Sequence, residues 1–577
     1  MKKVFNWHDL NILALLAAST GFSLSPTPPE FVVVDTSLGP VTGFTTAATG
    51  TAASCSAFYD IPYAANTSGA NRFKPPQPRE PWIEARPAVP REETVVCPQI
   101  TYTEISKGAV PDGRLDPRQD EDCLFLNVFT PLDAPLHDSP LPVMVYVHGG
   151  HWFVGSGIWD SGLPLNDGRQ LCADGGVVVV TINYRLSVFG FLAIDELLDE
   201  GGTAGNMGIQ DQRAALQWVQ KNAAAFGGDP TRVTLFGQSV GAQSVLTHLM
   251  SARSAPLFSA AILMSPPKLH FRAFRPASEY GNVFAAAAGC NDTVSKLACM
   301  RSLDWKDLLH MTPMFDPAWR QKITWFKTGE DWGPTDDGFE YPHGETPYST
   351  LQSGNFVPKP VIVGGVANEQ AQNAISTCNS STDYNEEGFR QEFAGRWGID
   401  SYGELMNKMV ALYGGHFSWR KAKVEAWTQA EYACTSRTVL DVLSTAGQPT
   451  FQYMMILPTL LDSNPPYCTG PMHGDDQLVM FGQIDYFLTP TEQALGKRMR
   501  TYFANFSRDH APCANWPAYG GAEERSYYVL NATDYISTQW KQTQCDFLIM
   551  NNLTQWKITA CSGAKDGVLD VPAWKHC

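Results

Sequence analysis

The sequence predicts an α/β protein built on a large, mostly parallel central sheet with helices on both faces. Two continuous apolar runs, Leu141–Val147 and Val177–Tyr184, are typical of strands that are buried on both sides of such a sheet. After them, Asp211–Asn222 carries apolar residues at helical spacing and stops before Gly227. Strands that alternate with helices in this way pair in parallel. With 44% hydrophobic residues in a chain of 577, a large core can be buried.

The N-terminal segment has the layout of a secretory signal peptide. Met1–Lys3 is basic, Leu10–Ala18 is apolar and small residues follow. The Pro-rich stretch Pro26–Pro29 then looks like the beginning of a mature chain, although an ordinary amphipathic helix is the alternative. We therefore expect a signal peptide at about residues 1–25, a secreted protein, and a single domain over residues 26–577.

The charge and hydropathy of the chain argue against a nucleic-acid partner and against a membrane span. The chain has 58 acidic and 42 basic residues, a formal charge of −16, and no Lys/Arg cluster that would mark a phosphate-binding face. We therefore expect no nucleic-acid partner. No segment after the N-terminus has the ~18 uninterrupted apolar residues of a membrane span, so no membrane span is expected.

Cysteines and glycosylation motifs agree with an exported protein. The chain has 13 cysteines, and disulfides persist in oxidising compartments. Asn-x-Ser/Thr sequences are candidate glycosylation sites, and there are six of them: Asn66, Asn291, Asn379, Asn505, Asn531 and Asn552. Such sequences also occur by chance, so they support export without deciding it.

The remaining elements are expected in chain order. Phe31–Gly43 has the pattern of a hairpin with a glycine in its turn, and a Pro-rich irregular stretch runs to Trp82. Three strands follow the central ones, at Ala260–Met264, Val361–Val366 and Phe451–Ile456. No internal repeat and no linker divides the mature chain.

One stretch carries a catalytic motif. The apolar run from Val233 enters Gly237-Gln-Ser239-Val-Gly241 and leaves as an amphipathic helix, which is the G-x-S-x-G pattern of a nucleophile elbow. A serine at the apex of such a turn stands clear of the backbone, and the flanking glycines remove side chains that would crowd it. Ser239 is therefore the candidate nucleophile, although so short a motif also arises in ordinary turns.

A nucleophilic serine needs a base and an acid that orients the base. In folds with this elbow the order along the chain is Ser, then Asp or Glu, then His. Downstream of Ser239, Glu369 directly follows a predicted strand and His473 lies in a loop just past another. Each residue alone would more often be ordinary surface. Asp475 and Asp476 are alternative acids, but they lie too close in sequence to His473 to face its ring easily.

Seven longer stretches precede Ser239 in the chain. They are Ala57–Ala64, Arg72–Pro76, Glu121–Asn127, His148–Gly150, Asn183–Arg185, Gly205–Arg213 and Phe226–Pro230. Together they resemble the type-B carboxylesterase and cholinesterase family of the α/β-hydrolase superfamily, and the resemblance covers nearly the whole mature chain. It implies an α/β-hydrolase fold, with Ser239 as the nucleophile, Glu369 as the acid and His473 as the base of a catalytic triad.

The resemblance also implies an oxyanion hole made by the backbone N–H groups of Gly150, His151 and Val240. His151 stands where the family usually has a third glycine, and Val240 stands where alanine is usual. Backbone donors remain available if the loop keeps its shape. Two further departures are Gln238, where cholinesterases have Glu, and Gln370, where glycine is usual.

A choline site is not expected. Cholinesterases carry a tryptophan shortly before their E-D-C motif, which holds quaternary ammonium by a cation–π contact. This chain has Asp112–Arg118 in that region, with Leu115 in place of an aromatic residue. Neutral esters are the expected substrates.

The family's disulfide pattern implies three pairs: Cys97 with Cys123, Cys290 with Cys299, and Cys434 with Cys545. Seven cysteines remain. Cys561 and Cys577 either pair with each other or Cys577 links two subunits into an oligomer, and the sequence does not choose between these. No C-x-x-C or His/Cys cluster has metal-ligand spacing, so neither a metal nor a cofactor is expected.

Two classes of function are consistent with these features. The leading hypothesis is a secreted serine carboxylic-ester hydrolase that acts through an acyl-enzyme on small neutral aliphatic or aryl esters. The alternative is a catalytically weak, cholinesterase-like adhesion or binding protein, because this fold also serves as an interaction domain. A lipase would need a long amphipathic lid, which no pattern in the sequence reveals.

Overall fold

The structure is a computed structural model, and it describes residues 30–47, 54–100, 116–134, 139–160, 162–268, 271–291, 293–311, 332–371, 384–415, 418–457, 470–551 and 553–554. In these ranges the chain forms a 12-stranded sheet with the spatial order β1-β2-β3-β4-β6-β5-β7-β8-β9-β10-β11-β12. The strands are β1 (Phe31–Thr36), β2 (Gly39–Ala47), β3 (Ser54–Pro62), β4 (Phe125–Pro131), β5 (Leu141–Val147), β6 (Val178–Ile182), β7 (Gly228–Gln238), β8 (Ala260–Met264), β9 (Val361–Val366), β10 (Thr450–Met455), β11 (Ser526–Leu530) and β12 (Tyr535–Thr538).

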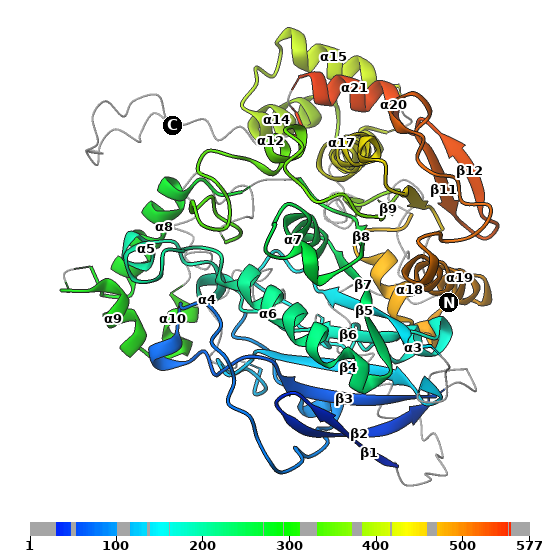
Figure 1. Ribbon diagram of the computed structural model, residues 1–577. Helices are drawn as coiled ribbons and strands as arrows, with labels where there is room; N and C mark the ends of the chain where they lie inside the picture. The colour runs from blue at the N-terminus through cyan, green and yellow to red at the C-terminus, as the bar shows by residue number, and fades with distance from the viewer. Residues whose placement is uncertain are drawn as a thin grey trace, which may run out of the picture.

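The middle of the sheet is parallel and its two ends are antiparallel. From β6 through β5, β7, β8, β9 and β10 to β11, each strand pairs in parallel with the next. At one end β1, β2, β3 and β4 pair antiparallel in that order, and β4 pairs antiparallel with β6. At the other end β12 pairs antiparallel with β11. Figure 1 shows the sheet twisting from the blue strands at its lower edge to the red strands at its upper right. The predicted mostly parallel α/β sheet is confirmed.

Helices pack on both faces of this sheet (Figure 1). Helices α6 and α7 pack on one face, and α3, α18 and α19 pack on the other. The α-helices are α3 (Arg169–Gly175), α4 (Ser187–Phe191), α5 (Asp195–Gly201), α6 (Met207–Asn222), α7 (Val240–Leu249), α8 (Phe274–Ala287), α9 (Lys296–Ser302), α10 (Trp305–His310), α12 (Pro347–Gln352), α14 (Glu386–Trp397), α15 (Glu404–Tyr413), α16 (Trp419–Thr428), α17 (Cys434–Leu443), α18 (Asp475–Phe481), α19 (Pro490–Asp509), α20 (Gly521–Glu524) and α21 (Gln542–Met550).

Strand β5 explains why the central apolar runs are continuous. Val143, Val145 and Val147 belong to the core shared with α6 and α7, whereas Met144 and Tyr146 belong to the core shared with α3 and α19. Successive strand residues point to opposite faces. A strand covered on both sides therefore has no position where a polar side chain would reach water.

Most predicted elements are present, with some shifted ends. Strands β8 and β9 have the predicted bounds, and β1 and β2 form the predicted hairpin. Helix α6 begins at Met207 instead of Asp211, and β7 begins at Gly228 instead of Val233. Gly208 lies in the first turn of α6. A Cβ added there would come within 2.7 Å of the Arg185 carbonyl oxygen, so a larger residue would not fit. This glycine therefore serves close packing and does not interrupt the helix.

The described residues contain four disulfides. One of them, Cys55–Cys172, joins β3 to α3 and was not predicted. Cys513 is a free thiol, and Cys561 and Cys577 lie outside the described residues. The other three disulfides are the pairs implied by the resemblance: Cys97–Cys123, Cys290–Cys299 and Cys434–Cys545.

The candidate glycosylation sites differ in exposure. Asn66 and Asn291 are exposed, whereas Asn505 and Asn531 are partly buried. The amide of Asn505 also donates a hydrogen bond to the Pro512 carbonyl at 3.2 Å, so this side chain already has a protein partner. Two sites, Asn379 and Asn552, lie outside the described residues, as does the expected signal peptide.

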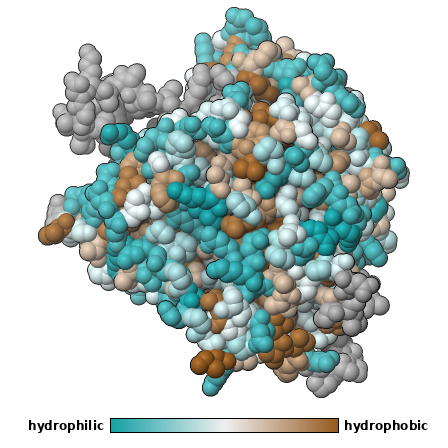
Figure 2. Space-filling model, in the orientation of Figure 1, coloured by the Kyte–Doolittle hydropathy of each residue, from teal (hydrophilic) through white to brown (hydrophobic). Residues whose placement is uncertain are grey.

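The surface mixes polar and apolar side chains, and no helix among the described residues is long and apolar enough to span a bilayer. Figure 2 shows hydrophobic residues near the lower edge of the molecule, where Figure 1 places β1. On this edge strand Phe31 and Val33 are 64% and 58% exposed. The exposed and half-buried positions of β1 alternate, as expected for a strand covered on one face.

Candidate active site

Ser239 occupies a sharp turn between β7 and α7. Its φ of 59° and ψ of −130° are values that residues other than glycine rarely adopt, and such strain costs about 1–3 kcal/mol. Both flanking glycines are required by close approach. A Cβ on Gly241 would lie 2.1 Å from the Val147 carbonyl oxygen, and one on Gly237 would lie 2.5 Å from the carbonyl carbon of Gly241. The predicted strand–turn–helix context of Ser239 is therefore present.

The Ser239 side chain is not engaged in structural hydrogen bonding. Its backbone N–H donates to the Met264 carbonyl at 2.9 Å, which ties the turn to β8. Its hydroxyl makes no hydrogen bond to any residue that the structure describes, and the residue is 4% exposed. The hydroxyl is thus available to a reaction partner.

Glu369 and His473 meet on the loops that follow β9 and β10. The Nδ1 of His473 lies 2.7 Å from Oε2 of Glu369, and the His473 backbone N–H donates to the Glu369 carbonyl at 3.2 Å. The other carboxylate oxygen, Oε1, accepts from the Val366 N–H at 2.9 Å. Glu369 is 2% exposed. A carboxylate only accepts hydrogen bonds, so Nδ1 of the imidazole carries the proton and Nε2 is the basic nitrogen.

The surroundings of His473 favour its protonated form. Burial opposes a charge on the ring, but the hydrogen bond and charge of Glu369, with the charges of Asp476 and Glu431, raise the pKa of His473 above its usual 6.5. A carboxylate that stabilises an imidazolium is what a general base needs when it takes a proton from a serine.

The two aspartates after His473 have other partners. Asp475 accepts a hydrogen bond from the Met472 N–H at 2.8 Å. Asp476 accepts from the Tyr453 hydroxyl at 2.7 Å and from the Ser265 hydroxyl at 3.0 Å, and its burial raises the pKa of its carboxyl to about 6. Neither carboxylate bonds the imidazole of His473.

The loop after β5 lies against the Ser239 turn. A Cβ on Gly149 would come within 3.0 Å of the Ser239 Cβ, and one on Gly150 within 2.1 Å of the Val154 carbonyl oxygen. The N–H groups of Gly150 and Val240 donate to no acceptor among the described residues. These donors are of the type that stabilises an oxyanion, and Val240 is the first residue of α7, where N–H groups have no helical partner.

His151 stands in the same loop in an unusual conformation. Its φ is 55°, and the φ of Trp152 is 60°. L-residues pay about 1–2 kcal/mol in this left-handed region. The His151 ring stacks on Phe153, with centroids 5.7 Å apart and planes at 21°. A glycine at this position would carry no such steric cost, so the structure gives a physical reason for the residue that the family usually has there.

A π-helix over Gln429–Ala433 brings beside the site two residues that no sequence pattern had indicated. The Tyr432 ring lies 4.8 Å from the His473 ring, and Glu431 accepts a hydrogen bond from the Gln370 amide at 2.7 Å. Isolated π turns are frequent at functional sites. No spacing in the sequence marks such a turn, because its hydrogen bonds join residues five apart and so insert one extra residue into the regular helical pattern.

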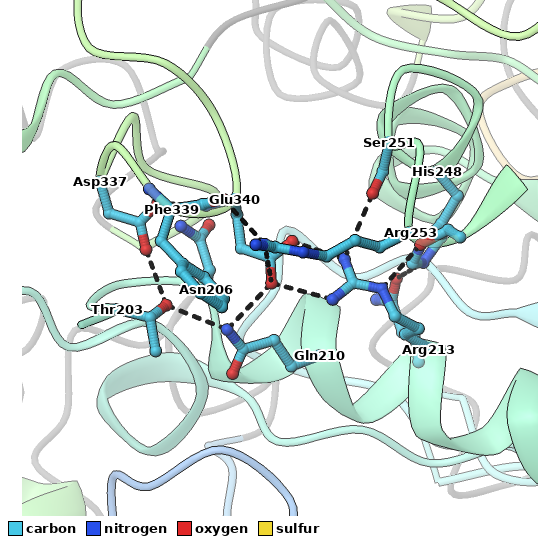
Figure 3. A network of polar contacts seen from close by, with 12 residues as sticks. Thr203, Asn206, Gln210, Arg213, His248, Ser251, Arg253, Asp337, Phe339 and Glu340 are labelled. Carbon is cyan, nitrogen blue, oxygen red and sulfur yellow. Dashed lines mark hydrogen bonds and ion pairs between the residues drawn. The ribbon is translucent and has the colours of Figure 1, made fainter. Parts of the chain in front are cut away.

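A buried polar network holds α7 in place behind the Ser239 turn. Figure 3 shows Arg213 of α6 facing Glu340, to which it donates two hydrogen bonds of 2.9 and 2.5 Å, and Gln210 donating to the same carboxylate at 3.1 Å. Arg213 also reaches Ser251, just beyond α7, at 3.5 Å. In the same network burial, with the charge of Arg213, lowers the pKa of His248 to about 3. His248 is therefore a neutral structural histidine and no rival base.

The sheet, the strand–helix turn at Ser239 and the carboxylate–histidine pair beyond β9 and β10 define an α/β-hydrolase fold. Comparisons with known proteins agree. The model of the carboxylesterase family matches residues 30–548. The chain belongs to the carboxylesterase family and is a carboxylic ester hydrolase.

Several relatives align over most of their length. The chain is 30% identical to carboxylesterase 1D of Rattus norvegicus over 97% of this chain and 98% of the relative. It is 31% identical to acetylcholinesterase of Electrophorus electricus over 87% and 85%. Among solved structures, a PNB esterase superposes with a TM-score of 0.71 at 28% identity, covering 89% of this chain and 99% of that one.

Proposed function

We propose that the protein hydrolyses small neutral carboxylic esters through an acyl-enzyme formed on Ser239, with His473 as the base and Glu369 as the acid that orients it. The observation that carries the proposal is the 2.7 Å contact between His473 Nδ1 and Glu369 Oε2, which leaves the basic Nε2 directed to the side of the ring away from the carboxylate.

In the first half-reaction, His473 Nε2 takes the hydroxyl proton as Ser239 Oγ attacks the carbonyl carbon of the ester. The carbonyl oxygen becomes an oxyanion, which the N–H groups of Gly150, His151 and Val240 stabilise. The bond to the alkoxy oxygen then breaks, and the proton on Nε2 passes to the departing alcohol. Glu369 stays ionised and holds the ring while the ring is charged.

In the second half-reaction, water repeats the sequence. His473 Nε2 takes a proton from water, whose oxygen attacks the acyl carbon. The bond from that carbon to Ser239 Oγ breaks, and the serine oxygen recovers its proton from Nε2. The products are a carboxylic acid and an alcohol, and no electron transfer or cofactor is required.

The preference for neutral esters rests on the residue before the nucleophile. Gln238 is a neutral amide, 3% exposed, whereas a carboxylate there would attract a cationic alcohol group. The Asp112–Leu115 part of the region where a cation-binding tryptophan was considered lies outside the described residues. The proposal therefore depends on Gln238 and on the sequence expectation for Leu115.

Secretion is part of the proposal. Four disulfides among the described residues fit an oxidising compartment, as do the exposed candidate glycosylation sites Asn66 and Asn291. A covalent dimer through Cys577 is the oligomer proposed from the sequence. Secretion is tested by the presence of the protein, shortened at its N-terminus, in the medium of expressing cells, and the dimer by non-reducing electrophoresis.

The activity is tested by turnover of a short-chain aryl ester and by labelling with a serine-directed organophosphate. The added mass should map to the peptide containing Gly237–Gly241, and Ser239→Ala should reduce kcat by a factor on the order of 10⁶. The exposed Ser302 provides a matched control, since Ser302→Ala should leave turnover unchanged. Label found elsewhere, or no turnover by a folded protein, would favour the non-catalytic binding protein.

A further inference from the structure

Gln238 reaches from the end of β7 to the catalytic histidine. Its amide nitrogen lies 3.3 Å from His473 Nε2. Its amide oxygen lies on the side of the loop after β5, since a Cβ on Gly149 would be 3.1 Å from it. The side chain is 3% exposed. Gln238 therefore fills the space between the loop that carries the oxyanion donors and the ring of the base.

The direction of this hydrogen bond follows from the other side of the ring. His473 Nδ1 faces the carboxylate of Glu369 at 2.7 Å, so Nδ1 bears the proton of the neutral imidazole and Nε2 bears the lone pair. An amide –NH₂ group is only a donor. The contact is therefore a hydrogen bond from Gln238 to the lone pair that the base uses in catalysis.

The nucleophile and Gln238 compete for that lone pair. The Ser239 hydroxyl makes no hydrogen bond to a described residue, whereas Gln238 occupies the Nε2 position. An imidazole nitrogen has one lone pair in the plane of its ring, so it accepts one good hydrogen bond at a time. Ser239 must displace Gln238 before it can transfer its proton.

The charges around the ring show why a neutral partner matters. Glu369 follows β9, Glu431 lies on the π-helix and Asp476 lies on α18, and all three favour the protonated ring. Arg396 pairs with Glu431 and offsets part of that charge. The side facing β7 carries Gln238, which has no charge. A fourth carboxylate there would favour the imidazolium, which cannot act as a base.

We propose that Gln238 is a positioning residue for the base: its amide holds the unprotonated Nε2 of His473 in the resting enzyme and yields that place to Ser239 when substrate binds. The inference rests on the proposed catalytic function of Ser239, Glu369 and His473. By this inference Gln238, a residue outside the triad, keeps His473 neutral. It thereby sets the lowest pH at which the enzyme is active.

Two substitutions separate this role from a merely structural one. In Gln238→Glu a carboxylate replaces the amide donor, and the acid limb of the kcat/KM profile should move up by at least about one pH unit. In Gln238→Met the volume is kept and the donor is lost, so the limb should move up by about half a unit to one unit. Above the shifted limbs, both variants should recover kcat/KM to within about threefold of the unsubstituted enzyme. A structural role would lower activity equally at all pH values.

The experiment measures kcat/KM of the full chain for a neutral aryl ester from pH 5 to pH 9.5, with Gln352→Glu as a control for an added surface charge. Gln352 is exposed on α12. If Gln238→Glu does not fold, as judged by circular dichroism, Gln238→Met alone decides. An upward shift in both variants supports the proposal. No shift in Gln238→Met, with or without one in Gln238→Glu, overturns it, because the amide then does not stabilise the neutral ring.

Failure of this inference differs from failure of the proposed function. If Ser239→Ala keeps full activity, the catalytic assignment itself is wrong. If Ser239→Ala is inactive while the acid limb stays fixed in Gln238→Met, the catalytic assignment stands and only the role of Gln238 is lost.

Discussion

Replacing Glu369 by Gln should invert the tautomer of His473, the proposed base. The two carboxylate oxygens have different partners: Oε1 accepts from the Val366 N–H at 2.9 Å and Oε2 faces His473 Nδ1 at 2.7 Å. A glutamine has one oxygen, and the buried Val366 donor requires it. The –NH₂ group then faces Nδ1, which must become the acceptor. The proton moves to Nε2, where it blocks transfer from Ser239.

The magnitude follows from this geometry. Glu369 is 2% exposed, so water does not replace the lost acceptor. Loss of the correct tautomer together with the stabilising charge should lower kcat by about 10³ to 10⁴, equivalent to about 4–5.5 kcal/mol of transition-state stabilisation. The fold should persist, because glutamine has nearly the same volume and keeps the hydrogen bond from Val366.

The assay compares kcat for an aryl ester in Glu369→Gln with that in Asp476→Asn. Asp476 is buried nearby but accepts from Ser265 and Tyr453 instead of His473. We expect Asp476→Asn to lose less than about tenfold, since it does not touch the ring. Circular dichroism and the unfolding temperature check the fold of both variants. Near-normal turnover in Glu369→Gln, with collapse in Asp476→Asn, would refute the assignment of the acid.

Three further outcomes are expected. The kcat/KM of the unsubstituted enzyme should fall as pH decreases through the pKa of His473, and because Glu369 raises that pKa the midpoint should lie above 6.5; a midpoint below 6.5 would contradict this environment. We expect the His151 ring to narrow the acyl side of the pocket, so His151→Gly should speed hydrolysis of bulky acyl esters and leave reactivation after organophosphate inhibition unchanged. Slower reactivation above pH 7 would instead mean that the imidazole activates water. A neutral ester should have a higher kcat/KM than the matched choline ester, because Gln238 carries no charge, and a clear preference for choline would reverse that view of the pocket.

The parallel strands could be predicted from the sequence because strands that are buried on both faces are apolar at nearly every position. Strands β5, β8 and β9 are apolar at every position or nearly so, and the helical spacing of α6 continues for three turns. Strands β4 and β11 are equally buried but mixed in composition, because β4 contains Asn127 and Thr130 and β11 contains Ser526. Strand β12 is mostly exposed and pairs with one neighbour. Their pairing depends on distant partners, which local patterns do not encode.

The residues of the candidate site also differ in how well the sequence predicts them. Ser239 was found from a turn that constrains residues adjacent in sequence, and Glu369 and His473 from their places after strands and from the family resemblance. Tyr432 reaches the ring only because a π-helix shifts the register of its helix. The contact between Gln238 and His473 joins residues 235 positions apart. Such contacts arise from the way the sheet brings loops together, and no spacing predicts them.

The order of the strands also sets when the site can form as the chain is made. Ser239, Glu369 and His473 follow β7, β9 and β10, so the proposed base is synthesised 234 residues after the proposed nucleophile. At about 5–20 residues per second, roughly ten to fifty seconds separate the two on the ribosome. Throughout that interval the growing chain contains Ser239 without its proposed base. A nascent or truncated chain that ends before residue 473 should therefore hydrolyse nothing, and ester cleavage begins only after β10 has been made.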